Sequence, residues 1–287
     1  MTEIKLFVDD TTALLAAQSN PELKILLQQR FNLINQHLIE LGMAINQSKT
    51  QLIIINPDKE GKEITINAGG QTIHHQHSLR VLGFDFAEDG RMDTYLWKGT
   101  NSLIRSIQTK TSMLRAIKPY TTFEQLAYIA NATLNSQILY VAPLWSQTGE
   151  TNIKRIQAAQ TRAARLMAWS RRKRKSELEH RQILFEQLGW MNTTQMTNQA
   201  TIQIVNKAIN NRSSEEINKM FNWKETRLKR DQNNFQVITE CTNRRPGPNL
   251  LDQGRKLFNK MPDKLRDNSL KPHQFKKELK SYILENF

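Results

Sequence analysis

The sequence predicts an α+β protein of two domains, residues 1–93 rich in strands and residues 94–287 mainly helical. Before Asp93, short runs of β-branched and aromatic residues alternate with glycine and asparagine turns, which is typical of strands and hairpins. Beyond it, apolar residues recur at helical spacing behind capping residues. The 287-residue length fits about two domains.

The first predicted strand begins at Ile4 and ends in two adjacent acidic residues, Asp9 and Asp10. Adjacent carboxylates repel one another unless a cation lies between them, and Mg²⁺ prefers oxygen ligands. The pair is therefore a candidate metal site for phosphoryl transfer. The alternative is that Asp10 caps a helix over residues 13–16.

A helix is predicted next, over residues 21–41, because leucine, isoleucine and phenylalanine recur there at helical spacing before Gly42. A turn carrying Lys49 follows, and then a buried strand over residues 51–55. Residues 64–66 and 72–73 flank the Gly69-Gly70 turn as a hairpin, and residues 79–86 alternate as one strand with a glycine inside it.

Three histidines, His74, His75 and His77, lie in a strand-like stretch of this first domain. Histidine clusters can hold metal ions, but no cysteine or carboxylate pair stands near them in sequence. We expect solvated side chains here.

The second domain is predicted to be a helical bundle. Residues 121–124 have the form of a capping box before an apolar stretch, and the same pattern recurs at residues 176–179. Between them, residues 153–167 form an apolar stripe opposite a basic face. The tryptophans could stack on bases, but at this spacing they are expected in or beside the core; they are Trp97, Trp145, Trp169, Trp190 and Trp223.

Three motifs in this order resemble the reverse transcriptase of non-LTR retrotransposons, and the resemblance covers nearly the whole chain. They are Phe7-Val8-Asp9-Asp10, similar to an aromatic-x-Asp-Asp signature; Gly42-Met43-Ala44-Ile45-Asn46 through Lys49-Thr50; and Val81-Leu82-Gly83-Phe84. Softer matches follow in residues 139–145, where the tryptophan lies closer than in the family pattern, and in residues 257–284.

The resemblance implies a partial polymerase palm in residues 1–93 and a helical thumb with a basic C-terminal extension in residues 94–287. Asp9 and Asp10 would hold Mg²⁺, and Lys49 would lie near the incoming nucleotide, although it could be an ordinary exposed lysine. Residues 82–84 would form the primer grip, for which the alternative is a bulge in a packed hairpin; they are Leu82, Gly83 and Phe84.

The family's fingers and an earlier metal-binding aspartate precede its double-aspartate turn, whereas only eight residues precede Asp9 here. The resemblance therefore implies the C-terminal portion of an RNA-directed DNA polymerase, which we expect to be inactive alone and active within a longer parent. Its partners would be an RNA template, a DNA primer and deoxynucleoside triphosphates. One alternative is a non-enzymatic nucleic-acid-binding remnant, and another is a helical structural protein.

The charge distribution independently favours a nucleic-acid partner. Residues 1–149 carry 13 basic and 13 acidic side chains, whereas residues 150–287 carry 28 and 14, so the net charge of +14 lies entirely in the second half. The candidate contacts could also be a solvated surface, and the run at 171–175 could be a nuclear address; they are Arg162, Arg165, Arg171, Arg172, Lys173, Arg174 and Lys175.

The single cysteine, Cys241, excludes an internal disulfide and a cysteine-based zinc knuckle. No apolar stretch approaches the roughly 20 residues of a membrane-spanning helix, and no signal-peptide core opens the chain. We therefore expect an intracellular protein, in the nucleus or cytoplasm, without a membrane partner.

Overall fold

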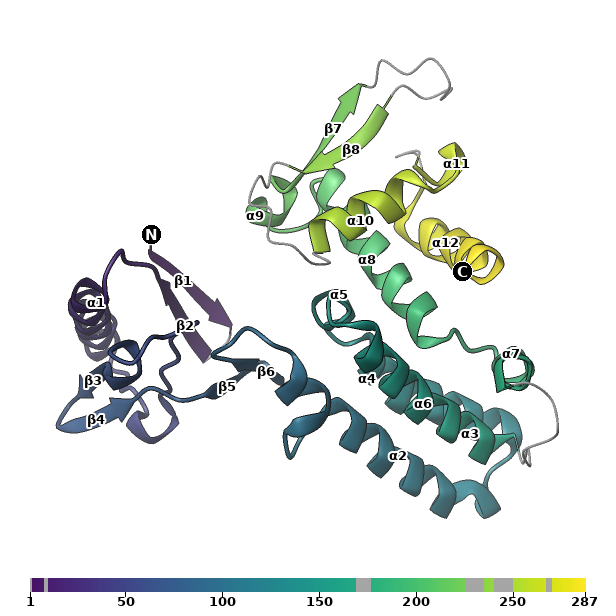
Figure 1. Cartoon of the computed structure of the whole chain (residues 1–287), viewed down its shortest axis with the longest axis horizontal. Helices are drawn as coiled ribbons and strands as arrows, with labels where there is room; N and C mark the ends of the chain where they lie inside the picture. The colour runs from purple at the N-terminus through teal and green to yellow at the C-terminus, as the bar shows by residue number, and fades with distance from the viewer. Residues whose placement is uncertain (1, 8–9, 169–176, 226–234, 240–249, 267–269) are drawn as a thin grey trace. The chain divides into compact units, whose positions relative to one another are not determined.

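The computed structural model describes residues 2–7, 10–168, 177–225, 235–239, 250–266 and 270–287. The fold is α+β, and the chain divides into two compact units, residues 1–95 and 96–287 (Figure 1). The sequence pattern places the boundary near Asp93, two residues before this division.

Unit 1 consists of consecutive hairpins around one long helix. Its elements are β1 (Thr2–Phe7), β2 (Asp10–Leu15), α1 (Asn20–Glu40), η1 (Gln47–Lys49), η2 (Gly61–Glu63), β3 (Thr65–Ala68), β4 (Gln71–His74), β5 (Ser78–Val81) and β6 (Phe84–Ala87). In the described residues, β1 pairs with β2, β3 with β4 and β5 with β6, each antiparallel and each a sheet of two strands.

Helix α1 confirms the prediction for residues 21–41 almost to the residue. The Ser19 hydroxyl accepts a hydrogen bond from the backbone N–H of Glu22, and Pro21 occupies the first turn, where its missing N–H costs nothing. Leu23, Leu27 and Phe31 pack on the buried side chains of the β3–β4 hairpin and its flanks. The core of unit 1 therefore lies between one face of α1 and this hairpin; it comprises Leu52, Ile54, Ile64, Ile66, Ala68 and Ile73.

A second contact joins α1 to the open edge of β3. The Gln28 side-chain amide donates to the carbonyl of Asn67 at 2.9 Å and accepts from the N–H of Asn67 at 2.8 Å. One side chain thus satisfies both backbone groups of an edge residue, as a neighbouring strand would.

Within the first 55 residues, one alternative and one prediction from the sequence are wrong. Residues 13–16 do not form a helix, because residues 10–15 pair with β1 as a strand. Residues 51–55 form no regular strand, although Leu52 and Ile54 are buried and Ile55 is exposed, the alternation of an extended chain. The only ladder contact of this described segment is an isolated bridge between Leu52 and His75.

Unit 2 is mainly helical, with one hairpin. Its elements are α2 (Leu103–Ile117), η4 (Lys118–Tyr120), α3 (Phe123–Ala130), η5 (Asn131–Asn135), α4 (Ser136–Leu139), α5 (Ala142–Trp145), α6 (Glu150–Met167), α7 (Glu177–Leu188), α8 (Thr193–Ile209), α9 (Glu215–Asn218), β7 (Phe221–Glu225), β8 (Phe235–Thr239), α10 (Leu250–Asn259), α11 (Asp263–Arg266) and α12 (Pro272–Asn286). The π-helical turn η3 (Thr94–Lys98) spans the division between the units.

Helix α8 is the central element of unit 2 and contacts α4, α5, α6, α10 and α12 (Figure 1). Its apolar side chains Ile202 and Val205 are fully buried, together with Phe258, Leu279 and Ile283 of α10 and α12. The predicted helical bundle is confirmed, whereas the antiparallel β7–β8 hairpin was not predicted.

The predicted capping box before α3 is shifted by one residue. Thr122, not Thr121, is the N-cap, and the Thr122 hydroxyl and the Gln125 side chain each accept a hydrogen bond from the other residue's backbone N–H. The core prediction is confirmed for Trp145 and Trp190, which are 0% and 4% exposed. Trp97 is half-buried, and the side chains of Trp169 and Trp223 lie outside the described residues.

Candidate functional site

Asp10, the second residue of the acidic pair, lies in the β1–β2 hairpin. The register pairs Phe7 with Asp10, so Asp10 is the first residue of β2, and its side chain is exposed. Asp9 lies outside the described residues, as does Val8. No hydrogen bond or ion pair to a described residue occupies the Asp10 carboxylate, which leaves its oxygens available to a hard cation.

Lys49 is the last residue of η1, a turn ordered by Asn46. The Asn46 side-chain oxygen accepts from the Lys49 backbone N–H at 3.2 Å and from the Ser48 hydroxyl at 2.8 Å. The Lys49 side chain is exposed, and in the described part of the chain no hydrogen bond or ion pair joins it to Asp10.

Residues 79–86 form two strands joined by a tight turn, not the single strand or the bulge that the sequence suggested. Leu82 and Gly83 both have positive φ, +49° and +82°, as in the two-residue turns that match strand twist. A leucine with positive φ raises the conformational energy of the backbone by about 1–2 kcal/mol. The Leu82 side chain is 46% exposed. Phe84 is instead buried against Tyr95, with ring centroids 4.6 Å apart.

Few of the predicted nucleic-acid contacts fall in described residues. Arg162 is exposed on α6 and Arg165 is half-buried near its end, whereas residues 171–175 lie outside the described residues. Earlier in α6, the Arg155 guanidinium lies 4.5 Å from the centroid of the Trp97 ring, and Lys154 pairs with Glu150. The basic face of α6 is therefore partly engaged within unit 2.

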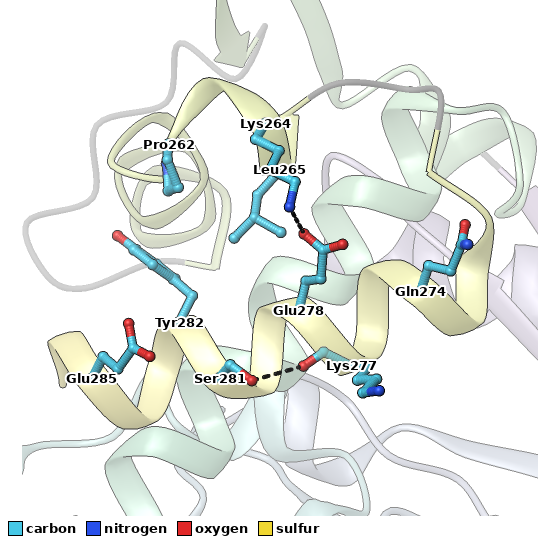
Figure 2. Close-up of a pocket in the computed structure, with 9 residues that line it drawn as sticks. All are labelled: Pro262, Lys264, Leu265, Gln274, Lys277, Glu278, Ser281, Tyr282 and Glu285. Atoms are coloured by element: carbon cyan, nitrogen blue, oxygen red, sulfur yellow. Dashed lines mark hydrogen bonds and ion pairs between the residues drawn. The ribbon is translucent and has the colours of Figure 1, made fainter.

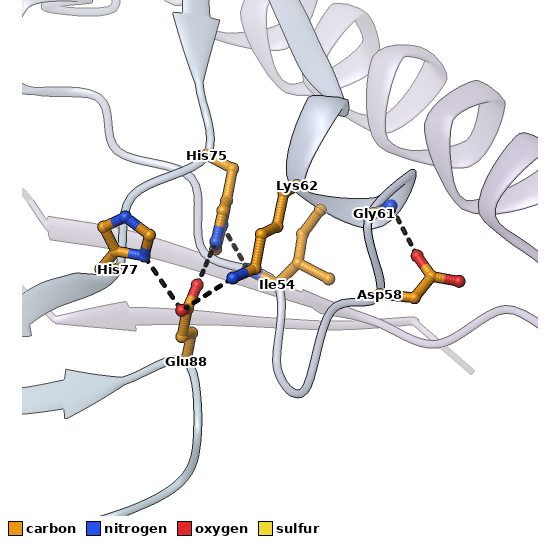
Figure 3. Close-up of polar contacts among 7 residues, drawn as sticks. All are labelled: Ile54, Asp58, Gly61, Lys62, His75, His77 and Glu88. Atoms are coloured by element: carbon orange, nitrogen blue, oxygen red, sulfur yellow. Dashed lines mark hydrogen bonds and ion pairs between the residues drawn. The ribbon is translucent and has the colours of Figure 1, made fainter.

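A cluster that the sequence did not predict surrounds Glu88, directly after β6 (Figure 3). One carboxylate oxygen lies 2.6 Å from Nε2 of His75, and the other lies 2.9 Å from Nδ1 of His77 and 3.6 Å from Nζ of Lys62. The His75 side chain is only 2% exposed, whereas that of His77 is 81% exposed. The expectation of solvated histidines is therefore wrong for His75, which is buried.

The protonation of His75 follows from its other neighbour. The backbone N–H of Ile54 donates to Nδ1 of His75 at 3.1 Å, so Nδ1 carries a lone pair. In a neutral imidazole the proton then lies on Nε2, which donates to Glu88. His75 thus bridges the segment that carries Ile54 to the end of β6 (Figure 3).

These contacts hold several backbone segments of unit 1 together. The Glu88 carbonyl accepts from Asn56 N–H at 2.7 Å, and its N–H donates to the carbonyl of His77 at 2.9 Å. Hydrogen bonds from His75 and then His77 lower the pKa of the Glu88 carboxyl to about 2. The contacts of Glu88 with His75, His77 and Lys62 therefore form a charged clasp, which joins the β5–β6 hairpin to the segment before η2.

A neighbouring acidic residue, Asp58, forms a hydrogen bond with the first residue of η2. The Asp58 carboxylate accepts from the backbone N–H of Gly61 at 2.7 Å and from the Asn20 side chain at 2.8 Å. Both contacts lower the pKa of the Asp58 carboxyl. Because Lys62 follows Gly61, this turn positions its ammonium beside Glu88 (Figure 3).

The cluster places three potential metal ligands, one atom each from His75, His77 and Glu88, within 4.8 Å of one another. Metal binding through Nε2 of His75 would require Nδ1 to carry the proton and to donate it to an acceptor. Nδ1 instead faces the N–H of Ile54, and Lys62 already supplies a cation. The arrangement favours a proton-bonded clasp over a metal centre.

The clasp makes a testable prediction for acid stability. The pKa of the Glu88 carboxyl is lower in the folded than in the unfolded protein, so its ionised form stabilises the fold. This contribution is fully present at pH values above the unfolded-state pKa of 4.5 and is lost as the pH falls toward 2. We expect Glu88→Gln to increase amide hydrogen exchange of residues 52–56 at neutral pH, with the difference from wild type closing between pH 4.5 and 2.

Glu63→Gln is the matched control, because Glu63 is exposed and has no ion-pair partner among the described residues. Equal exchange of wild type and Glu88→Gln at pH 7 would show that the clasp does not hold this segment.

An open groove of about 640 Å³ runs along α12 (Figure 2). Its lining mixes charges of both signs, and Lys264 pairs with Glu278 at 3.2 Å. The Tyr282 hydroxyl donates to the carbonyl of Lys260, and burial raises the pKa of that hydroxyl. The groove offers no converging set of unpaired polar groups for a small molecule.

Comparisons with protein-family models, with curated proteins and with solved structures find no match for this chain. None of the described helices combines the length and the apolar character that crossing a bilayer requires.

Proposed function

We propose that this chain is the C-terminal portion of an RNA-directed DNA polymerase of the kind that non-LTR retrotransposons encode. The observation that carries the proposal is the β1–β2 register, in which Asp10 begins the second strand of a hairpin. An aspartate that begins a hairpin strand differs from one that caps a helix, which was the alternative for Asp10. The exposed Leu82-Gly83 turn of the β5–β6 hairpin is a second support.

In this proposal Asp9 and Asp10 would hold Mg²⁺, which when bound would stabilise the negative charge that develops during nucleotidyl transfer. Lys49 neutralises charge on the incoming deoxynucleoside triphosphate, and the Leu82-Gly83 turn contacts the primer. Unit 2 contributes positive charge for the template–primer backbone, since the excess basic residues lie after residue 149.

The first test separates binding from synthesis. We expect the purified 287-residue chain to bind an RNA–DNA primer–template without extending the primer, because two-metal chemistry needs ligands on both sides of the ions. Binding is measured by fluorescence anisotropy, and extension by denaturing gels with Mg²⁺ and all four nucleotides. Measured extension would contradict the expected inactivity.

A second candidate function is a non-enzymatic nucleic-acid-binding remnant, which the net charge of +14 favours. The two candidate functions predict different results for a longer parent polypeptide that includes the fingers. There, Asp9→Ala is expected to abolish synthesis by the polymerase while leaving template binding intact. A wild-type parent that binds template without synthesis would favour the remnant. Binding that does not weaken with salt would contradict both, and would favour a structural protein.

A further inference from the structure

Helix α12 is anchored firmly to unit 2 through one face. Phe275, Leu279 and Ile283 follow one another at four-residue spacing and are 4%, 0% and 0% exposed. They pack in the cluster that includes Phe258 and Leu265. The orientation of the remaining faces of α12 is therefore set by the core.

One exposed flank of α12 is basic. Lys276, Lys277 and Lys280 are exposed, and helical spacing places them on neighbouring positions of one surface. The two acidic residues of the helix, Glu278 and Glu285, line the groove of Figure 2, and Lys277 lines it with them. Lys276 and Lys280 do not line this groove, so the basic surface extends from the groove to the neighbouring side of the helix.

The three lysines have no acidic partner among the described residues, which is also true of the exposed lysines Lys207, Lys260 and Lys271. Three other exposed lysines of unit 2 pair with a carboxylate one turn earlier on the same helix. These pairs are Lys154 with Glu150 at 2.9 Å, Lys219 with Glu215 at 2.5 Å and Lys256 with Asp252 at 2.6 Å. Among the described residues, no ion pair involves Lys276, Lys277 or Lys280.

This arrangement disfavours the helix in isolation. Lys276 and Lys280 are like charges at i,i+4, and Lys277 and Lys280 are at i,i+3, which costs a few tenths of a kcal/mol per pair. The first turn of α12 contains no acidic residue, and its N-cap is Lys271, although cations are unfavourable at this end of a helix dipole. The negative charge of a bound polyanion would offset these unfavourable interactions between positive charges.

We propose that the exposed face of α12, defined by Lys276, Lys277 and Lys280, binds the phosphate backbone of a nucleic-acid duplex. The inference rests on the proposed function, which supplies the nucleic-acid partner. It adds a contact surface more than 100 residues beyond the basic cluster at residues 171–175. The surface reads no bases. It contributes affinity by neutralising phosphates and releasing their counterions.

The test is a charge-matched pair of triple variants. One carries Lys276→Gln, Lys277→Gln and Lys280→Gln; the other removes three paired lysines, with Lys154→Gln, Lys219→Gln and Lys256→Gln. Both lower the formal net charge by three, from +14 to +11. Circular dichroism checks that both variants fold. Fluorescence anisotropy with a labelled RNA–DNA duplex then gives affinity at several KCl concentrations.

We expect the α12 variant to bind about tenfold or more weakly at low salt, and its slope of log affinity against log salt to fall by about two to three. The paired-lysine variant is expected to change the slope by less than about one. Equal losses in both variants would show a general charge effect and would overturn the inference, as would no loss in either. If wild type itself bound no duplex, the proposed function would fail with it.

Discussion

Replacing Gln160 by leucine is expected to lower the free energy of unfolding of unit 2 by about 3–5 kcal/mol. Gln160 is fully buried on α6 and is the centre of a polar network. Its amide nitrogen donates to the Asn135 side chain and to the carbonyl of Met191, both at 3.0 Å, and its oxygen accepts from the Thr193 hydroxyl at 3.1 Å.

Leucine fills a similar volume but leaves these groups without partners. Asn135 and Thr193 are themselves 3% and 0% exposed, so water cannot replace the lost bonds without entering the core. An unsatisfied buried polar group costs about 1–3 kcal/mol, and this substitution leaves more than one. The loss therefore exceeds any gain from the added apolar surface.

Tryptophan fluorescence during urea unfolding measures this effect in unit 2 alone, because all five tryptophans follow residue 95. Gln108→Leu is the control, since Gln108 is exposed on α2 and makes no side-chain hydrogen bond with a described residue. A Gln160→Leu protein as stable as the control would mean that the network contributes little.

The second large effect is expected at Gly254, where α10 crosses α8. A Cβ atom added to Gly254 would lie 2.8 Å from a methyl carbon of Val205 and 3.5 Å from one of Thr201. Both of these residues are fully buried, so neither can move aside freely. We expect Gly254→Leu to destabilise unit 2 by about 3 kcal/mol.

Gly254→Ala separates crowding from helix propensity. Alanine favours a helix over glycine by about 1 kcal/mol, so a net loss of stability would measure the overlap with Val205. Gly149→Ala, at the N-cap of α6, is a control for the overlap alone: its Cβ meets nothing within 4 Å, although alanine is a poorer N-cap than glycine. The same urea titration applies, and a stabilised Gly254→Ala protein would contradict close helix packing.

Helix α1 could be predicted because its signals are local. The spacing of Leu23, Leu27 and Phe31 and the Ser19-Pro21 start all lie within the segment they define. The segment at residues 51–55 could not, because Ile54 N–H is satisfied by the side chain of His75, 21 residues away, where a strand would have a backbone carbonyl. No local pattern distinguishes these two partners.

The Glu88 clasp could have been found from register. A two-residue turn at Leu82-Gly83 pairs Ser78 with Ala87, and one step further places His77 opposite Glu88. The sequence was instead interpreted as one strand, because a leucine at positive φ gives no warning of a turn. The position of Asp9 stays a prediction, since it lies outside the described residues.

The amide of Gln28 has a consequence for self-association. An open strand edge can recruit another chain by backbone pairing, but Asn67 already has both backbone groups bonded by this side chain. An invading peptide would first have to displace α1 from its seat on Leu52, Ile66 and Ile73. Intermolecular fibril growth along this border is thus coupled to partial melting of the amino-terminal lobe.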